Sequence, residues 1–440
     1  MNYFYLHIPF CRQKCPYCKF ALTPIFDDMK KRRYLEYLKR EIRGYFSISS
    51  TNLLTNQPAT IYFGGGTPSI LTTTEVREIL ECFPEVPFLK ELSEAKRKAE
   101  DFSWISQEKN PPYPPLQRGF PEISFECNPE DITEGYVRRL FDLGINRISL
   151  GVQSLNNTTL QSIHRSDRES IFHALDAIQS IYNRGKTIIG GSGVETVGVR
   201  GKIENGGAKR TSFSTTETFD TFGYKSMEND MKRNISINMD FILGLPFSKP
   251  GETLRNIQEL HEKFPFITHT SVYMLEEGMY PKDWKKNSIN EIEIEQEYAA
   301  ICKHFESLGW NHYEISNWAK PEYESVHNRG YWNHTNYRGF GLSATSYEDG
   351  KRWENSTSFS HYYRGENISS EKLTPEQIEL EEIIFGIRTF SLDAQIFPRE
   401  IVEELTQEGA IKIEDERIIL TPAGIFRENT IIAKLIEYIE

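Results

Sequence analysis

Residues 5–18 read Tyr-Leu-His-Ile-Pro-Phe-Cys-Arg-Gln-Lys-Cys-Pro-Tyr-Cys and bring three of the chain's six cysteines, Cys11, Cys15 and Cys18, within eight residues. Structural zinc normally takes four protein ligands, and neither a fourth cysteine nor a suitably spaced histidine follows. Three soft thiolates suit an iron–sulfur cluster that leaves one iron open to another ligand. The alternative is three unrelated buried thiols, which the clustering beside proline and tyrosine disfavours.

This motif resembles the signature of the radical S-adenosylmethionine (radical SAM) superfamily. The Tyr-x-His-Ile-Pro-Phe lead-in is similar to that of oxygen-independent coproporphyrinogen III oxidases and their heme-chaperone relatives, and the likeness extends from Tyr5 to about Tyr347. The resemblance implies a [4Fe-4S] cluster on Cys11, Cys15 and Cys18. It also implies that the methionine moiety of S-adenosylmethionine (SAM) chelates the fourth iron.

Composition narrows the class of protein further. The formal charge of −12 argues against generic nucleic-acid binding, which needs a basic surface. No run of about 18 apolar residues is present, so no transmembrane segment is expected. The N-terminus lacks a signal-peptide pattern, and cluster ligands need free thiols. We therefore expect a soluble, cytoplasmic protein in which Cys82, Cys127 and Cys302 are ordinary structural thiols.

Short apolar runs alternate with helical patterns, as in β/α units that form a parallel sheet. We expect one helix to begin after Thr133 and to end at Gly144, and another to open with a capping box of Ser166 and Glu169. The expected strands are 4–8, 59–63, 122–126, 146–150, 235–242 and 268–274, and the expected helices include 28–46, 73–82 and 291–308. Six such units predict an α/β fold, a partial (β/α)6 TIM-like barrel, which the resemblance also implies.

Three parts of the chain depart from this alternation. Residues about 90–120 and 186–233 have little periodicity and are interpreted as insertions into a barrel domain over 1–350. A polar connection is expected after Tyr347. Residues 351–440 then form a C-terminal domain, with a helix at 399–408, two short runs at 410–413 and 417–420, and a small winged-helix-like α+β region. Four Lys or Arg face nine Asp or Glu over 401–440, so packing is favoured there over DNA binding.

The candidate SAM site lies where barrel strands end, as in other β/α barrels. An acid inside a barrel strand is costly without a partner, and a salt bridge is the alternative to ligand binding for Glu126. By resemblance, Gly65, Gly66 and Thr67 hold the methionine ammonium and Arg165 pairs with the carboxylate. The remaining SAM contacts that the resemblance implies are Tyr5, Tyr17, Glu126, Gln153 and Asp240.

A second motif, His327-Asn328-Arg329-Gly330-Tyr331-Trp332, matches the H-N-x-x-Y-W pattern of the heme-chaperone branch. Histidine is a common heme ligand, and aromatic rings stack on porphyrins; an aromatic core beneath a loop is the alternative. The resemblance implies heme binding by His327, Tyr331 and Trp332. His7 has a competing claim to face a porphyrin, which the sequence leaves open.

Two departures from the oxidases favour the chaperone branch. Phe20 stands where oxidases carry a fourth cysteine, and the chain begins at the cluster loop, without the oxidases' N-terminal extension. We therefore expect a heme chaperone that delivers heme to acceptor hemoproteins, among them respiratory ones, without coproporphyrinogen dehydrogenase activity. Oxidative decarboxylation of coproporphyrinogen III in porphyrin biosynthesis is the alternative, and radical chemistry on another substrate is a broader one. Whether the chain forms a homodimer stays open.

Overall fold

The structure is a computed structural model that describes residues 2–24, 27–48, 58–83, 121–187, 235–275, 281 and 284–438. Its main feature is a single twelve-stranded sheet with the order β14-β13-β12-β11-β1-β4-β5-β6-β7-β8-β10-β9. Both predicted insertions lie outside the described residues, apart from 186–187 at the end of a helix.

Six parallel strands form the centre of the sheet, as the sequence predicts. They are β1 (Asn2–Ile8), β4 (Pro58–Gly65), β5 (Glu122–Cys127), β6 (Arg147–Gln153), β7 (Ser236–Leu243) and β8 (His269–Met274). The sheet ends in β14 on one side and in β9 on the other and does not close on itself, so the barrel is open, which confirms the predicted partial barrel. The carboxyl ends of all six strands lie at one edge, where the site residues follow them.

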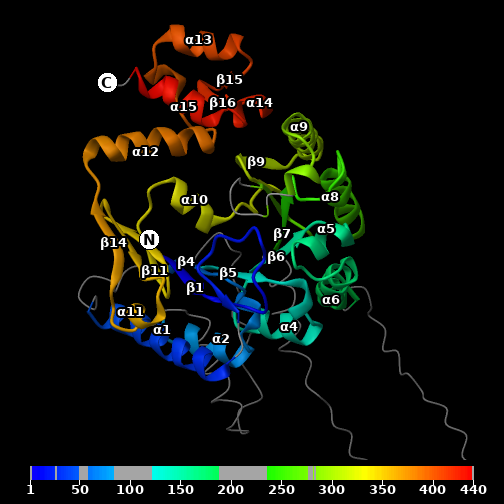
Figure 1. Cartoon of the computed structure of the whole chain (residues 1–440), viewed down its shortest axis with the longest axis vertical. Helices are drawn as coiled ribbons and strands as arrows, with labels where there is room; N and C mark the ends of the chain where they lie inside the picture. The colour runs from blue at the N-terminus through cyan, green and yellow to red at the C-terminus, as the bar shows by residue number, and fades with distance from the viewer. Residues whose placement is uncertain are drawn as a thin grey trace, which may run out of the picture.

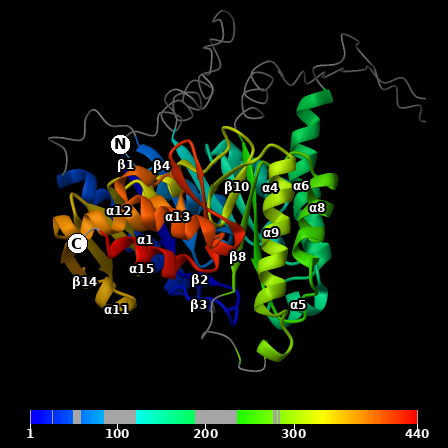
Figure 2. The ribbon, with the colours of Figure 1, turned by 90° about the horizontal axis from the view of Figure 1, so that it is seen from above.

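Helices cover the outside of this curved sheet in an arc (Figure 1), and Figure 2 shows several of them standing side by side along one flank. They are α1 (Asp28–Ile48), α2 (Thr73–Leu80), α4 (Glu134–Asp142), α5 (Asn157–Ser162), α6 (Arg168–Thr187), α8 (Glu252–Lys263) and α9 (Glu291–Ser307). Apolar faces of the longer helices pack on the sheet in one continuous core.

Two helix starts test the capping predictions. Helix α4 begins after Thr133, whose side chain accepts from the Tyr136 N–H, and Gly144 just beyond its end has a φ of 85°; both features are confirmed. The capping box of Ser166 and Glu169 is wrong. Helix α6 begins at Arg168, and the Asp167 carboxylate accepts from the Ser170 N–H, because Asp167 is the better placed acceptor for the first turn.

The sheet continues beyond the six central strands on both sides. On one side, β10 (Asn317–Ala319) pairs antiparallel with β8, followed by β9 (Asn311–Glu314). On the other, β11 (Tyr337–Phe340) pairs parallel with β1, followed by β12 (Thr345–Glu348), β13 (Lys351–Asn355) and β14 (Asn367–Lys372). The polar connection expected after Tyr347 is therefore wrong. Its residues are polar because these edge strands are partly exposed.

The C-terminal part follows β14 and lies at the top of Figure 1. It contains α12 (Pro375–Arg388), α13 (Arg399–Gln407), a hairpin of β15 (Ile411–Glu414) and β16 (Arg417–Leu420), α14 (Pro422–Ile425) and α15 (Glu428–Ile436). The predicted helix and two short strands are present, whereas the winged-helix likeness and the division at 350/351 stay predictions. The sheet itself runs to Lys372. No helix within the described residues is long and apolar enough to cross a bilayer.

Candidate functional site

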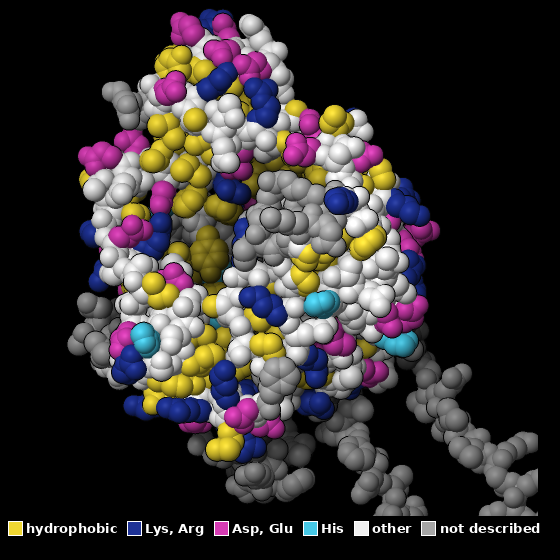
Figure 3. All heavy atoms as spheres, in the orientation of Figure 1, with side chains coloured by type: hydrophobic (Ala, Val, Ile, Leu, Met, Phe, Trp, Pro, Cys, Tyr) yellow, Lys and Arg dark blue, Asp and Glu magenta, His cyan; other side chains and the backbone are white. Residues whose placement is uncertain are grey.

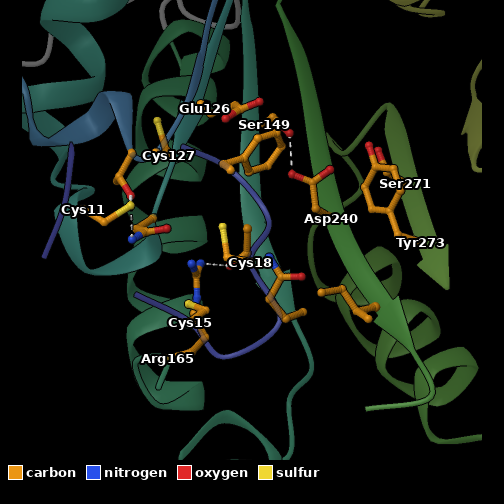
Figure 4. A pocket seen from close by; sticks show the side chains of 18 of the residues that line it. Cys11, Cys15, Cys18, Glu126, Cys127, Ser149, Arg165, Asp240, Ser271 and Tyr273 are labelled. Carbon is orange, nitrogen blue, oxygen red and sulfur yellow. Dashed lines mark hydrogen bonds between the residues drawn. The ribbon is translucent and has the colours of Figure 1, made fainter. Parts of the chain in front are cut away.

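A cavity of about 500 Å³ opens at the carboxyl ends of the parallel strands. Figure 4 shows side chains from the cysteine loop and from β5, β6, β7 and β8 pointing into it. The predicted site residues that line it are Cys11, Cys15, Tyr17, Cys18, Gly65, Gly66, Thr67, Glu126, Gln153, Arg165 and Asp240. The structure thus brings the predicted cluster ligands and most of the predicted SAM contacts around one space. We call it the first cavity.

The cysteine loop leaves β1 and crosses the mouth of this cavity. Cys11 is buried, and its Sγ lies 3.0 Å from the Thr67 Oγ1 of the glycine turn. Burial raises the pKa of the Cys11 thiol to about 11, partly offset by the Thr67 hydrogen bond. Burial likewise raises the pKa of Cys18. Burial thus disfavours the thiolate forms of Cys11 and Cys18, and bound metal would stabilise them.

The arrangement of the thiols discriminates between kinds of metal site. Within the ranges that the structure describes, no three His, Cys, Asp or Glu side chains converge closely enough to hold one metal ion. A single zinc ion needs its ligands at about 2.0–2.3 Å from one point. In a [4Fe-4S] cluster each cysteine binds a different iron, so thiols spread around one end of a cavity fit that group.

The glycine turn after β4 packs tightly against β1. Gly65 has a φ of 105°, and a Cβ on Gly66 would approach the Phe10 carbonyl oxygen to 2.6 Å. The N–H groups of Gly66 and Thr67 donate to the carbonyls of Ile8 and Phe10 at 2.8 and 2.7 Å. Those N–H groups are thus used within the protein. The turn offers carbonyl oxygens to a ligand, which suits an ammonium group.

Glu126 is half-buried at the wall of the cavity. Its Oε1 accepts a 2.8 Å hydrogen bond from the Tyr62 hydroxyl. Burial, with a smaller contribution from the nearby Asp240, raises the pKa of Glu126 to about 7, against the hydrogen bonds from Tyr62 and from the backbone of Gly65. No cation pairs with this carboxyl in the described part of the chain, so a cationic ligand is the group that its ionised form lacks.

Asp240 lies opposite on β7, with its carboxylate already in a hydrogen-bond network (Figure 4). The Ser149 hydroxyl donates to Oδ2 at 2.6 Å, and the Asn238 amide donates to Oδ1 at 2.8 Å. Burial raises the pKa of Asp240, and these bonds oppose the shift. Ser271 also donates to this carboxylate, and since a carboxylate accepts about four hydrogen bonds, one position is left to accept from a ribose hydroxyl.

Strand β6 ends in a distorted segment that carries one predicted contact, Gln153, and accepts a hydrogen bond from another, Arg165. Gln153 has a φ of 67°, unusual for a residue with a side chain, next to a register shift against β7. Strain of this kind clusters at functional sites. The Arg165 guanidinium reaches back to donate to the Gly151 carbonyl at 2.6 Å. Arg165 also interacts with Cys15 of the cysteine loop, so it is a fixed cation beside that loop.

Sequence reasoning missed the polar floor of this cavity. This floor includes Ser149, Asn238, His269 and Ser271. Hydrogen bonds join these four side chains to one another and to Asp240. Their signal is present in the sequence: polar residues at every second position of otherwise apolar strands face the inside of a barrel.

A second cavity of about 300 Å³ lies on the other side of the cysteine loop. Figure 3 shows a hollow with hydrophobic side chains in this region, beneath α10 (Val326–Trp332). Its lining consists of Tyr5, His7, Lys19, Phe20, Ala21, Tyr331, Tyr337, Ser343 and Thr345. Lys19 and Phe20 line both cavities. Tyr5, which we predicted as a SAM contact, lines this second cavity, and its contact with SAM stays a prediction.

Both histidines with a claim on heme are buried and hydrogen-bonded. The His7 ring bonds Tyr5 Oη at 3.1 Å and the Ala21 carbonyl at 2.8 Å. The His327 Nδ1 lies 2.7 Å from Thr60 Oγ1, and its Nε2 lies 2.8 Å from Tyr331 Oη. Burial lowers the pKa of His7 to about 4 and that of His327 to about 3, so both rings are neutral at pH 7.

The residues of the His327–Trp332 motif point in different directions from α10. His327 borders neither cavity, Tyr331 lines the second cavity, and Trp332 packs edge-on against Phe385 of α12 at 5.5 Å between ring centroids. Gly330 allows the helix to approach β1, because a Cβ there would lie 2.4 Å from the Tyr3 ring.

Glu122, the first residue of β5, fixes the start of α10. Its carboxylate accepts from the Ser325 hydroxyl and from the N–H groups of Val326 and His327, at 3.0–3.1 Å. An anion at a helix N-terminus satisfies donors that have no partner within the helix. Glu122 therefore holds His327 against the barrel.

Comparisons with known proteins agree with this geometry. The model of the Radical SAM superfamily matches residues 5–202. A heme chaperone HemW of Lactococcus lactis is 25% identical, with 99% of this chain and 97% of that protein covered; a HemW of Bacillus subtilis is also 25% identical, with 97% of each covered. An oxygen-independent coproporphyrinogen III oxidase of Helicobacter pylori is 30% identical over 37% of this chain and 29% of its own length. The coproporphyrinogen III oxidase (HemN) structure from Escherichia coli has a TM-score of 0.66 at 17% identity, with 98% of this chain and 89% of that chain covered, and so shares its fold.

Proposed function

We infer that this chain, which belongs to the HemW- and HemN-like family of radical SAM proteins, is a heme chaperone that binds heme and delivers it to acceptor hemoproteins. The observation that carries the proposal is a second, aromatic cavity beside the cluster loop. Relatives named heme chaperones match the chain over nearly its whole length, including α12–α15. Acceptors in the respiratory chain and a cytoplasmic location are part of the proposal.

A radical SAM protein carries a [4Fe-4S] cluster and SAM, and the first cavity fits both. Cys11, Cys15 and Cys18 would hold the cluster. Thr67, beside Cys11, and the carbonyls of the glycine turn would receive the amino group of SAM, and Arg165 its carboxylate. Glu126, with no cation of its own, would face the positive end of the molecule. Gln153 and Asp240 would contact the nucleoside.

The second cavity has the chemistry of a porphyrin site. Tyr5, Tyr331, Tyr337 and Phe20 supply aromatic surface, which packs well on a flat macrocycle. Phe20 is 57% exposed, so an apolar ring stands free at the mouth. A site open to the surface suits a protein that must release its ligand to another.

The coproporphyrinogen oxidase reading has less support. The HemN likeness is one of fold at 17% identity, and one fold hosts many reactions. The Helicobacter pylori oxidase matches little more than a third of the chain. Phe20 also occupies the position where the oxidases carry a fourth cysteine. We therefore propose that the chain lacks coproporphyrinogen dehydrogenase activity.

The test uses anaerobically reconstituted protein with cluster and SAM. Titration with hemin, followed by absorption, should reveal stable binding that weakens in His327→Ala combined with Trp332→Ala. Incubation with coproporphyrinogen III and a reductant should yield no protoporphyrinogen. Decarboxylation at catalytic rates, or the absence of stable heme binding by the wild-type protein, would favour the enzyme.

A further inference from the structure

His327 is separated from both cavities by tyrosine side chains. Tyr62 lines the first cavity and stacks on the His327 ring, at 4.9 Å between centroids and 27° between planes. Tyr331 lines the second cavity, and its hydroxyl meets His327 Nε2. The histidine is only 1% exposed. A ligand in the second cavity therefore reaches His327 only if Tyr331 moves.

The two hydrogen bonds of His327 indicate which nitrogen could bind a metal. A neutral imidazole donates through one nitrogen and accepts through the other. A phenol is the stronger acid of the two hydroxyls and therefore the better donor, so we assign Tyr331 O–H as donor to Nε2 and Nδ1–H as donor to Thr60 Oγ1. Metal-bound histidines show the same arrangement, in which one ring nitrogen carries the lone pair and the other donates to an oxygen that fixes the tautomer.

We propose that Tyr331 is a gate between the second cavity and His327, which rests on the proposed function. Heme enters the second cavity, the Tyr331 hydroxyl leaves Nε2, and that nitrogen binds the heme iron. One hydrogen bond is exchanged for one iron–nitrogen bond. No proton has to leave, because Nδ1 already carries it. The Tyr331 ring has a partner on the cavity side in Tyr337, edge-on at 4.7 Å.

Two substitutions, one at each hydrogen-bond partner of the His327 ring, should change heme affinity in opposite directions and so test the gate. Tyr331→Phe keeps the aromatic ring and removes the competing hydroxyl, so the Kd for hemin should fall about fivefold and association should become faster. Thr60→Val removes the partner of Nδ1–H while preserving shape, and should raise the Kd about tenfold. A structural role alone would weaken binding in both. Tyr182→Phe is the matched control, because it removes a tyrosine hydroxyl on α6 that donates to the Ile235 carbonyl, and it should leave the Kd unchanged.

Hemin titrations and stopped-flow association on the cluster-loaded protein provide the readouts, and thermal melting verifies that each variant folds. Tyr331→Leu serves as a second variant that lacks the hydroxyl. Weaker or unchanged binding in folded Tyr331→Phe and Tyr331→Leu would overturn the gate. Heme binding that survives His327→Ala would also overturn it, yet leave the chaperone proposal standing. Wild-type protein that binds no heme would instead refute the proposed function.

Discussion

The first cavity and helix α10 differ in how their functional residues are positioned. The residues of the first cavity follow successive parallel strands or lie on the loop after β1, and they line one space. The residues of α10 come from one short helix, yet they disperse: His327 into the core, Tyr331 to the second cavity and Trp332 to α12. The difference shows that the residues of one sequence motif can all line the same cavity, whereas only one residue of another motif, Tyr331, lines a cavity.

The physical reason lies in the backbone. Parallel strands deliver their carboxyl ends to one edge, so residues far apart in sequence converge there. On a helix, positions four apart share a face whereas neighbours diverge. His327 and Tyr331 thus meet each other, and Trp332 points elsewhere. Substituting one key residue in each region measures how far the first cavity and helix α10 are independent of each other.

The largest effect is expected at the cluster loop. Cys15→Ala should lose most of the iron and acid-labile sulfide of anaerobically reconstituted protein. The other two thiols of that loop, Cys11 and Cys18, are predicted ligands themselves and cannot replace it. Cys127→Ala is the matched control. Cys127 lines the same cavity from β5, with its thiol directed to the Phe125 carbonyl, and should retain full metal content. Equal loss in both variants would mean that the ligand set is wrong.

The anchor of α10 should give the next largest effect. Glu122→Ala removes the acceptor of three donors, of Ser325, Val326 and His327, two of them buried, and should lower the free energy of unfolding by about 3 kcal/mol. Glu122→Gln keeps one acceptor oxygen and should cost about 1 kcal/mol. Urea denaturation measures both. Metal content should stay normal in Glu122→Gln; cluster loss there would show that the two regions are not independent.

Glu126 links stability to pH within the first cavity. Its pKa is raised from 4.5 to about 7 on folding, so its ionisation costs stability as pH rises from 4.5 to 7, and the cost persists above that range. Without ligand, Glu126→Gln should therefore be more stable than wild type at pH 8, by about 1–3 kcal/mol, with no gain at pH 4. Its SAM affinity should fall, because the neutral amide lacks the charge. A pH-independent difference in denaturant midpoint would contradict this assignment.

Local pattern sufficed for the sequence to predict the parallel strands, the cysteine loop and the Thr133 cap. It failed where partners come from far along the chain. Ser166 instead donates to Glu130, 36 positions away, and leaves the cap of α6 to Asp167. Residues after Tyr347 form edge strands that extend the sheet from β12, which pairs with β11 beside β1. The enclosure of His327 depends on Thr60, 267 positions away, which no spacing rule could have identified.

Phe20 lies between the two cavities, and its substitution should give the smallest effect. The side chain is 57% exposed and lines both cavities, so it contributes little to the core. Phe20→Ala should change the free energy of unfolding by no more than about 0.5 kcal/mol and should leave iron and sulfide unchanged. If the ring covers a bound porphyrin, the Kd for hemin should rise about threefold, as expected for the loss of one aromatic contact, and Phe20→Tyr should restore it. A change in SAM affinity without a change in hemin affinity would place Phe20 with the first cavity, and the aromatic site would then have to bind its ligand without it.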